Sequence, residues 1–122
     1  MWLKATVIAS CLILVSTAAQ AQGVDADQFL EAYAADIPHV KQQLARKLHD
    51  IEYGLGLANA ELAVRRHQEQ LYCQPPSLAL ADEQLVSILR DEVKEVPPTG
   101  KMDVGLALLY GLERVFPCNT PQ

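Results

Sequence analysis

Residues 39–68 read HVKQQLARKLHDIEYGLGLANAELAVRRHQ. Apolar residues recur along this stretch at successive spacings of 4, 4, 3, 4, 3 and 4, the period of one face of an α-helix. This face consists of Val40, Leu44, Leu48, Ile51, Leu55, Ala58 and Leu62. The pattern predicts one long central helix from about His39 to Gln68.

Two glycines, Gly54 and Gly56, lie inside this long helix. A glycine costs roughly 1 kcal/mol in a helix interior, so its presence there requires a reason. We expect a helix-packing surface from Tyr53 to Ala60, where small residues let another helix approach, within the monomer or across a homodimer. A kink in the helix is the alternative.

Three shorter helices are expected around the long one. Asp25 and Gln28 have the spacing of a capping box, which predicts a helix from about Ala26 to Ala35. Apolar residues at helical spacing predict a third helix from about Ala81 to Glu95 and a fourth from about Lys101 to Phe116. No alternating run with turn chemistry predicts a β-hairpin. The fold class is therefore all-α, a small four-helix domain.

Proline-rich segments separate these helices. Cys73-Gln74-Pro75-Pro76 cannot continue a helix and predicts a turn and an extended loop. The turn from Glu95 to Lys101 is stiffened by Pro97 and Pro98, and a pre-ordered loop loses less entropy on binding. Glu95, Pro97, Pro98 and Lys101 are therefore a candidate partner-binding loop. A plain connector between two helices is the alternative.

Residues 1–21 have the zones of a secretory signal peptide. An apolar run from Ala5 to Val15 precedes the small-x-small site Ala19-Gln20-Ala21. Cleavage after this site predicts a single helical domain, residues 22–122, in the periplasm. An apolar run of eleven residues falls short of the roughly 20 needed to span a bilayer, so no membrane anchor is expected. The other alternative is a lipoprotein signal peptide in which Cys11 is the lipid-modified cysteine.

Export would leave two cysteines, Cys73 and Cys118, in an oxidising compartment, where a disulfide is the default. Cys73 lies just beyond the long helix and Cys118 just beyond the last one. A bridge would therefore pin the C-terminus to the loop that precedes the third helix. Closing a 46-residue loop stabilises a domain by roughly 4 kcal/mol in the chain-entropy account.

Composition bounds the class of partner. The 122-residue chain is 50% hydrophobic and 20% charged, which is typical of a globular domain with one core. Its 10 Lys and Arg against 15 Asp and Glu give a net charge of -5. This sign is wrong for neutralising phosphates, so no nucleic-acid partner is expected.

The residues of known catalytic and metal sites do not occur in usable patterns. Beyond the signal peptide the only serines are Ser77 and Ser87, and neither lies in a nucleophile elbow. His39, His49 and His67 are ten and eighteen residues apart, too far for the i, i+4 pair of a zinc helix. His49 with Glu52 resembles a carboxylate–histidine pair, but no second copy exists. We expect no enzyme activity, no cofactor and no metal.

Six short motifs follow one another between Ile51 and Cys118. They are Tyr53-x-x-Gly56, Tyr72-Cys73-x-Pro75, Gln84-Leu85-Val86, Pro97 after that helix, Ala107-Leu108 and Phe116-Pro117-Cys118. The series resembles the Rap/Tai-type periplasmic immunity proteins. Those are small helical proteins that protect a bacterium from peptidoglycan-cutting amidases delivered by type VI secretion systems, and they commonly form homodimers.

The resemblance implies a function in binding rather than catalysis. It implies a periplasmic immunity protein that inhibits a cell-wall amidase effector by occluding its active site, with that amidase as protein partner and a possible homodimer. The alternative is an acid-stress or general periplasmic chaperone, because an acidic, disulfide-pinned helical protein can lose charge at low pH and expose apolar surface.

Overall fold

The structure, a computed structural model, describes residues 23–118. These residues form the helices α1 (Ala26–Ala34), α2 (Pro38–Ala60), α3 (Asp82–Glu95) and α4 (Val104–Val115). A π-helical turn, η1 (Glu61–Arg65), follows α2, and a 3-10 helix, η2 (Pro97–Lys101), follows α3. The described part of the chain contains no β-strand, and the all-α class is confirmed. The predicted signal peptide, residues 1–21, lies outside the described residues.

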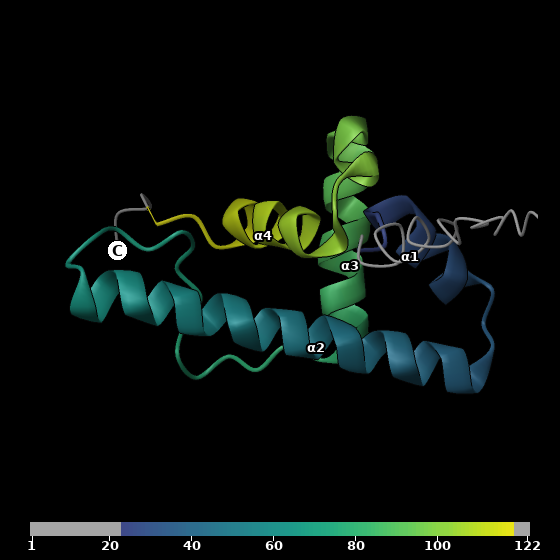
Figure 1. Ribbon diagram of the computed structural model, residues 1–122, viewed down its shortest axis with the longest axis horizontal. Helices are drawn as coiled ribbons and strands as arrows, with labels where there is room; N and C mark the ends of the chain where they lie inside the picture. The colour runs from purple at the N-terminus through teal and green to yellow at the C-terminus, as the bar shows by residue number, and fades with distance from the viewer. Residues whose placement is uncertain (1–22, 119–122) are drawn as a thin grey trace, which may run out of the picture.

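The long central helix is confirmed as α2 together with η1. Pro38 occupies its first turn, where the missing proline N–H is harmless and its fixed φ suits a helix. The helical path ends after η1, where His67 adopts a φ of 50°. In Figure 1, α2 extends along one side of the molecule, α4 lies above it, and α3 crosses both beside α1.

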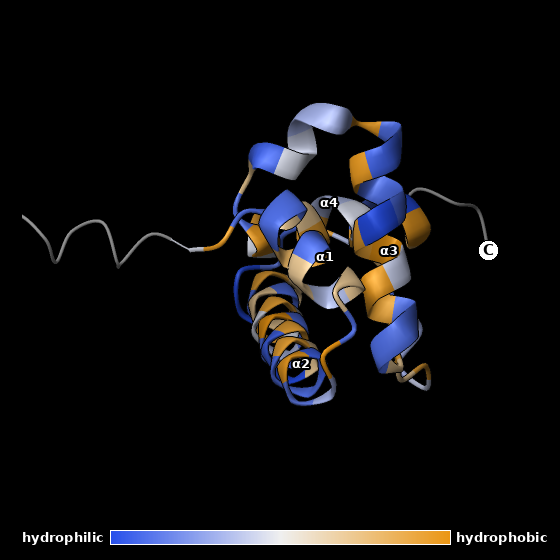
Figure 2. Ribbon diagram, turned by 90° about the vertical axis from the view of Figure 1, so that its right-hand side faces the viewer, coloured by the Kyte–Doolittle hydropathy of each residue, from blue (hydrophilic) through white to orange (hydrophobic). Residues whose placement is uncertain are grey.

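All four helices contribute to one hydrophobic core. Figure 2 shows hydrophobic residues interleaved with hydrophilic ones along α2, as a helix with one buried face requires. The largest fully buried apolar side chains are Phe29 from α1, Leu48 from α2, Leu85, Val86 and Leu89 from α3, and Val104, Leu108 and Leu112 from α4. Burying each of these contributes roughly 1.5–3 kcal/mol. The core therefore lies where α3 meets the other three helices.

Helices α3 and α4 approach each other closely at Gly111. A Cβ atom on Gly111 would lie 2.8 Å from Cγ2 of Ile88 and 3.1 Å from its carbonyl oxygen. A larger residue there would therefore require Ile88 to shift. Glycine is needed at this position because the helices touch, not because of its backbone freedom.

Within the described residues, Gly54 and Gly56 do not pack against another helix of the same chain. Both are exposed, and a Cβ atom on either would meet nothing within 4 Å. The buried side chains of α2 are Ala45, Leu48 and Asn59, because the second half of the helix reaches past most of the core. Packing of the two glycines across a homodimer stays a prediction.

The helix starts follow local chemistry. The capping box of α1 is confirmed, with Gln28 N donating to Asp25 Oδ1 at 2.7 Å. The start predicted for the last helix, Lys101, is wrong, because residues 97–101 form η2 instead. Helix α4 begins at Val104, where Asp103 accepts a hydrogen bond from Gly105 N at 2.8 Å.

The disulfide between Cys73 and Cys118 is confirmed. Its Cα atoms are 4.9 Å apart and its cysteines are 45 residues apart in the sequence. Beside it, Cys73 N donates to the carbonyl oxygen of Phe116 at 2.8 Å. The end of α4 is thus fixed to the loop that follows η1.

Replacing Cys73 with serine should lower the free energy of unfolding by about 2–5 kcal/mol, since the open chain gains entropy when unfolded. Equilibrium denaturant unfolding measures this change. Cys118→Ser should have the same effect, and the double substitution should add little to either single one. An unchanged unfolding free energy in both single variants would contradict the structural role of the bridge.

Candidate functional site

A groove of about 700 Å³ lies between the second half of α2 and the loop that follows η1. We call it the α2 groove. Its α2 wall is made by Tyr53, Gly56, Leu57 and Ala60, its loop wall by Gln70, Tyr72, Gln74, Pro75, Pro76 and Leu78, and one end by His49, Asp50 and Glu52. Asn59 lies between the two walls. The volume falls in the range of ligand-binding clefts in proteins.

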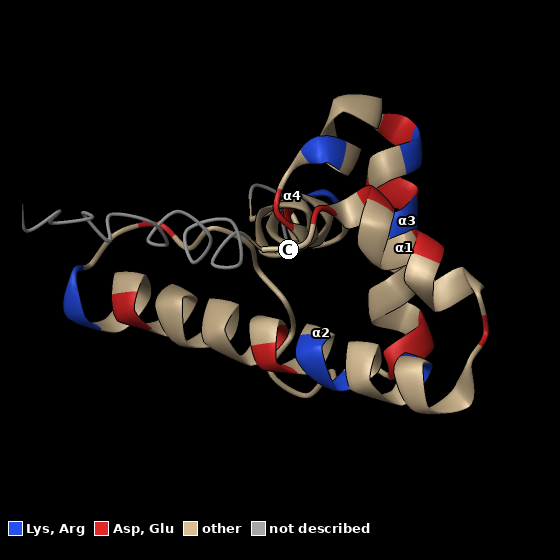
Figure 3. Cartoon of the chain, turned by 45° about the vertical axis from the view of Figure 1, so that its right-hand side comes forward, with Lys and Arg blue, Asp and Glu red and all other residues tan. Residues whose placement is uncertain are grey.

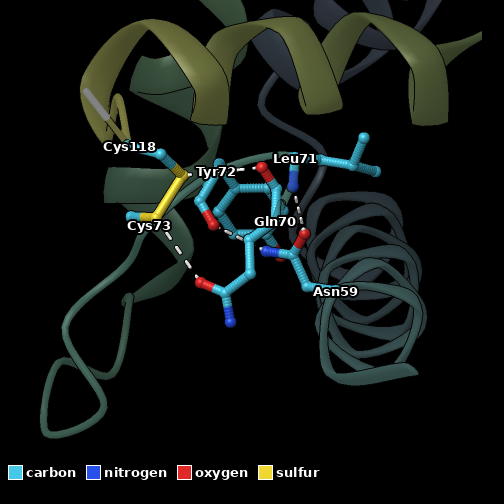
Figure 4. The surroundings of a disulfide bond; sticks show 6 residues. All are labelled: Asn59, Gln70, Leu71, Tyr72, Cys73 and Cys118. Carbon is cyan, nitrogen blue, oxygen red and sulfur yellow. Dashed lines mark hydrogen bonds between the residues drawn. A yellow bond between two sulfur atoms is a disulfide. The ribbon is translucent and has the colours of Figure 1, made fainter. Parts of the chain in front are cut away.

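Asn59 joins the two walls of the groove. Its side chain is buried, donating from Nδ2 to the carbonyl oxygen of Tyr72 at 2.8 Å and accepting from Leu71 N at 2.8 Å (Figure 4). One asparagine thus pairs with a donor and an acceptor of the loop backbone. The loop wall is held in place on α2 without being part of a regular element.

Sequence reasoning missed Asn59, although a signal was present. Asn59 lies four residues after Leu55 and three before Leu62, so it shares their side of the helix. A polar residue within an apolar stripe is buried only if it finds hydrogen-bond partners. Here those partners are backbone groups of a loop 12 and 13 residues later.

Tyr72 contributes the buried aromatic ring of the loop wall. Its side chain is 3% exposed, and it precedes the bridged Cys73. Burial raises the pKa of its phenol above the ordinary value, and the nearby negative charge of Glu52 raises the pKa further. Gln70 Oε1 lies 3.4 Å from Cys73 Sγ, a contact rather than a hydrogen bond because a bridged sulfur carries no proton.

His49 connects the acidic end of the groove to α3. Its Nε2 lies 2.6 Å from Asp82 Oδ1 and its Nδ1 lies 3.3 Å from Glu52 Oε2. Figure 3 shows acidic residues at the end of α3 that lies beside α2. A neutral imidazole has one N–H, so both contacts are hydrogen bonds only when His49 is protonated. His39 and His67, by contrast, are exposed.

A second surface is formed by residues 95–101, which we call the tip. It lies at the end of α3 that is farther from α2 (Figure 1). The predicted binding residues Glu95, Pro97, Pro98 and Lys101 are all exposed there. Glu95 is the last residue of α3, and residues 97–101 of the tip form the 3-10 helix η2.

The tip is fixed by its contacts with α1. Thr99 and Gly100 are buried, and a Cβ atom on Gly100 would collide with the carboxylate of Asp27. Lys101 Nζ lies 3.2 Å from Asp27 Oδ2. Glycine at position 100 thus lets the tip lie directly against α1, and the exposed prolines project from a segment that is anchored on its other side.

A hollow of about 570 Å³ lies beside the tip, lined by Glu92, Val96, Thr99, Met102, Tyr110, Glu113 and Arg114. We call it the tip hollow. Arg114 Nε donates to Glu92 Oε2 at 2.6 Å, and the Glu92 side chain is 5% exposed. This hydrogen bond, with the negative charge of Glu92, raises the pKa of Arg114. A buried carboxylate is thereby paired at the inner side of the hollow.

Among residues 23–118, no group of three or more His, Cys, Asp or Glu side chains could hold a metal ion. No helix in that part of the chain is both long and apolar enough to cross a membrane. The candidate binding surfaces are the α2 groove and the tip.

Comparison of the chain with known protein families, with curated proteins and with solved structures finds no match. The Rap/Tai resemblance therefore stays an expectation from the sequence motifs.

Replacing Asn59 with alanine should lower the free energy of unfolding by about 1–3 kcal/mol, because it leaves two backbone groups without partners. It should also speed hydrogen exchange at the Leu71 amide, which is bonded to Asn59. Gln74→Ala is the control, since it removes one exposed hydrogen bond to the Leu78 carbonyl. Equal exchange at Leu71 in both variants would show that Asn59 does not hold the loop.

Proposed function

We propose that the protein is a periplasmic binding protein that inhibits a cell-wall amidase by occluding its active site. The observation that carries the proposal is the tip: an exposed, proline-led segment whose inner side is anchored on α1. An occluding segment must fit a cleft without losing much freedom on binding. A segment that is already ordered fulfils that requirement, because it lost its conformational entropy on folding and loses little more on binding.

The surface around the tip has the side chains that dominate protein interfaces. Val96 is 39% exposed and Tyr110 is 38% exposed, and both line the tip hollow. Arg114 is oriented there by Glu92. Aromatic residues and arginines account for much of the binding energy at known interfaces. The tip and the tip hollow together form a continuous candidate contact surface with apolar and charged parts.

Two features of the chain support a periplasmic location. The disulfide between Cys73 and Cys118 is compatible with an oxidising environment. Residues 1–21 have the pattern of a signal peptide. An inhibitor of an enzyme that cuts peptidoglycan must lie on the same side of the membrane as the enzyme, and the resemblance to Rap/Tai immunity proteins supplies the amidase as target.

The chaperone alternative has one observation in its favour. Tyr53 and Val64 are each 71% exposed, and Leu57 is 55% exposed, all along α2 and η1. Apolar side chains so placed are available to bind other chains, whether a client, a partner or a second copy. A chaperone would suppress aggregation of many unrelated proteins, whereas an immunity protein would inhibit one enzyme at a stoichiometry of one to one.

Charge reversal at the tip should weaken inhibition. Glu95→Lys and Lys101→Glu change exposed groups of the tip, so each should reduce protection of cells that express a periplasm-directed cognate amidase. Glu61→Lys is the control, because Glu61 lies on η1, in an element distant in sequence and fold from the tip. Survival of the cells and inhibition of the purified amidase are the two measurements.

Export is the second arm of the same experiment. The full-length chain should protect, and a version that lacks residues 1–21 should not. Equal protection by both versions, or an equal effect of the Glu61 and tip variants, would contradict the proposal. Suppression of aggregation of unrelated proteins without inhibition of any amidase would favour the chaperone.

A further inference from the structure

We propose that the α2 groove binds an extended segment of another polypeptide that carries a lysine or arginine side chain. This inference is independent of the tip and of the amidase, because it rests on the shape, length and charge of a different surface.

The walls of the groove are pre-formed. Asn59 joins the loop to α2 through two hydrogen bonds, and the Cys73–Cys118 bridge fixes the same loop to the end of α4. Pro75 and Pro76 further limit the conformations of the loop wall. A groove held open in this way receives a ligand without first having to be ordered.

The length of the groove suits a short extended segment. The groove residues on α2 run from His49 to Ala60, which are separated by eleven residue steps along the helix. At a rise of 1.5 Å per residue this is about 16 Å. An extended chain advances by about 3.3 Å per residue, so about five residues of a polypeptide fill this length.

The middle of the groove provides apolar contacts with polar groups between them. Tyr53 and Leu57 on one wall and Leu78 on the other are exposed, at 71%, 55% and 39%. Alternate side chains of an extended segment point to one side, and those could pack between the two walls. The exposed side-chain amide of Gln70 on the loop wall can donate a hydrogen bond to the backbone of the bound segment and accept one from it.

The negative charge at one end of the groove favours a lysine or arginine side chain in the bound segment. Asp50 and Glu52 lie at one end, and no lysine or arginine lines any part of it. His49 is the one lining group there that can become positive, and Glu52 and Asp82 already face it. The carboxylate of Asp50 is exposed and makes no ion pair among the described residues. A lysine or arginine beside Asp50 would also lie near the Tyr53 ring, where a cation is attracted to the aromatic face.

The two exposed glycines of α2 give the test a matched pair of variants. Gly56 lines the groove and Gly54 does not, yet a Cβ atom on either meets nothing within 4 Å. Gly54→Leu and Gly56→Leu should therefore both fold, with a gain in helix stability of similar size. Only Gly56→Leu places a side chain inside the groove.

The probe is a library of random heptapeptides displayed on phage, selected on the purified chain. Selection should enrich peptides with a lysine or arginine at one fixed position. For the best of these as a fluorescent synthetic peptide, Gly56→Leu should weaken binding about tenfold or more, and Gly54→Leu should leave it within about twofold. Asp50→Asn should weaken binding by about three- to tenfold. Asp91→Asn, a change at an exposed carboxylate on α3, should not.

Three results would overturn the proposal. One is a selection without enrichment of basic peptides. Another is equal binding by the two glycine variants. The third is sedimentation showing a dimer that Gly56→Leu dissociates and Gly54→Leu does not, because a second copy of the chain would then occupy the groove.

Discussion

The contact between α3 and α4 at Gly111 sets the positions of the elements packed around it. A side chain at position 111 would collide with the side chain and backbone of Ile88. The lack of a side chain at Gly111 therefore allows the two helices to pack closely. Leu85 and Leu89 on one helix and Leu108 and Leu112 on the other then close the core around the contact. The position of α4 in turn brings Phe116 and Cys118 to the loop that carries Cys73. Core packing thus decides where the disulfide can form.

The two proposed binding surfaces, the α2 groove and the tip, are each held by contacts within the chain. On one side, α4 and the bridge hold the loop that faces α2, and Asn59 joins that loop to the helix. On the other side, the end of α3 carries the tip, which Gly100 and Lys101 attach to Asp27 on α1. A small domain can recognise a protein through such surfaces, because a surface that is already ordered loses less entropy on binding.

Local signals in the sequence predicted much of the fold. The capping box at Asp25 and the spacing of apolar residues along α2 depend on nearby residues alone, and the cysteine pair depends on the compartment. The glycines show the limit of such reasoning. A small residue permits close packing but does not say whether a partner is there: Gly54 and Gly56 contact no other helix of the chain, whereas Gly111, which the sequence reasoning did not single out, does.

The candidate site was predictable in part for the same reason. Prolines and flanking charges indicated an exposed turn at residues 95–101, and the structure places it at the tip. Its attachment to α1 through Asp27 joins residues more than 70 positions apart, and no periodicity reports such a pair. The partners of Asn59 are likewise backbone groups. Because nearly every residue has the same backbone groups, the sequence gives no sign of which ones Asn59 binds.

Site-specific photo-crosslinking from the tip would show whether the tip contacts the active site of an amidase. A photo-reactive amino acid placed at Pro98 in the exported protein, with the same amino acid at exposed Asp91 as control, would capture whatever contacts the tip in the cell. The account predicts that Pro98 crosslinks to a cell-wall amidase, at residues around its active site, and that Asp91 does not. Crosslinks from Pro98 to many unrelated exported proteins, or to an amidase surface far from its active site, would contradict it.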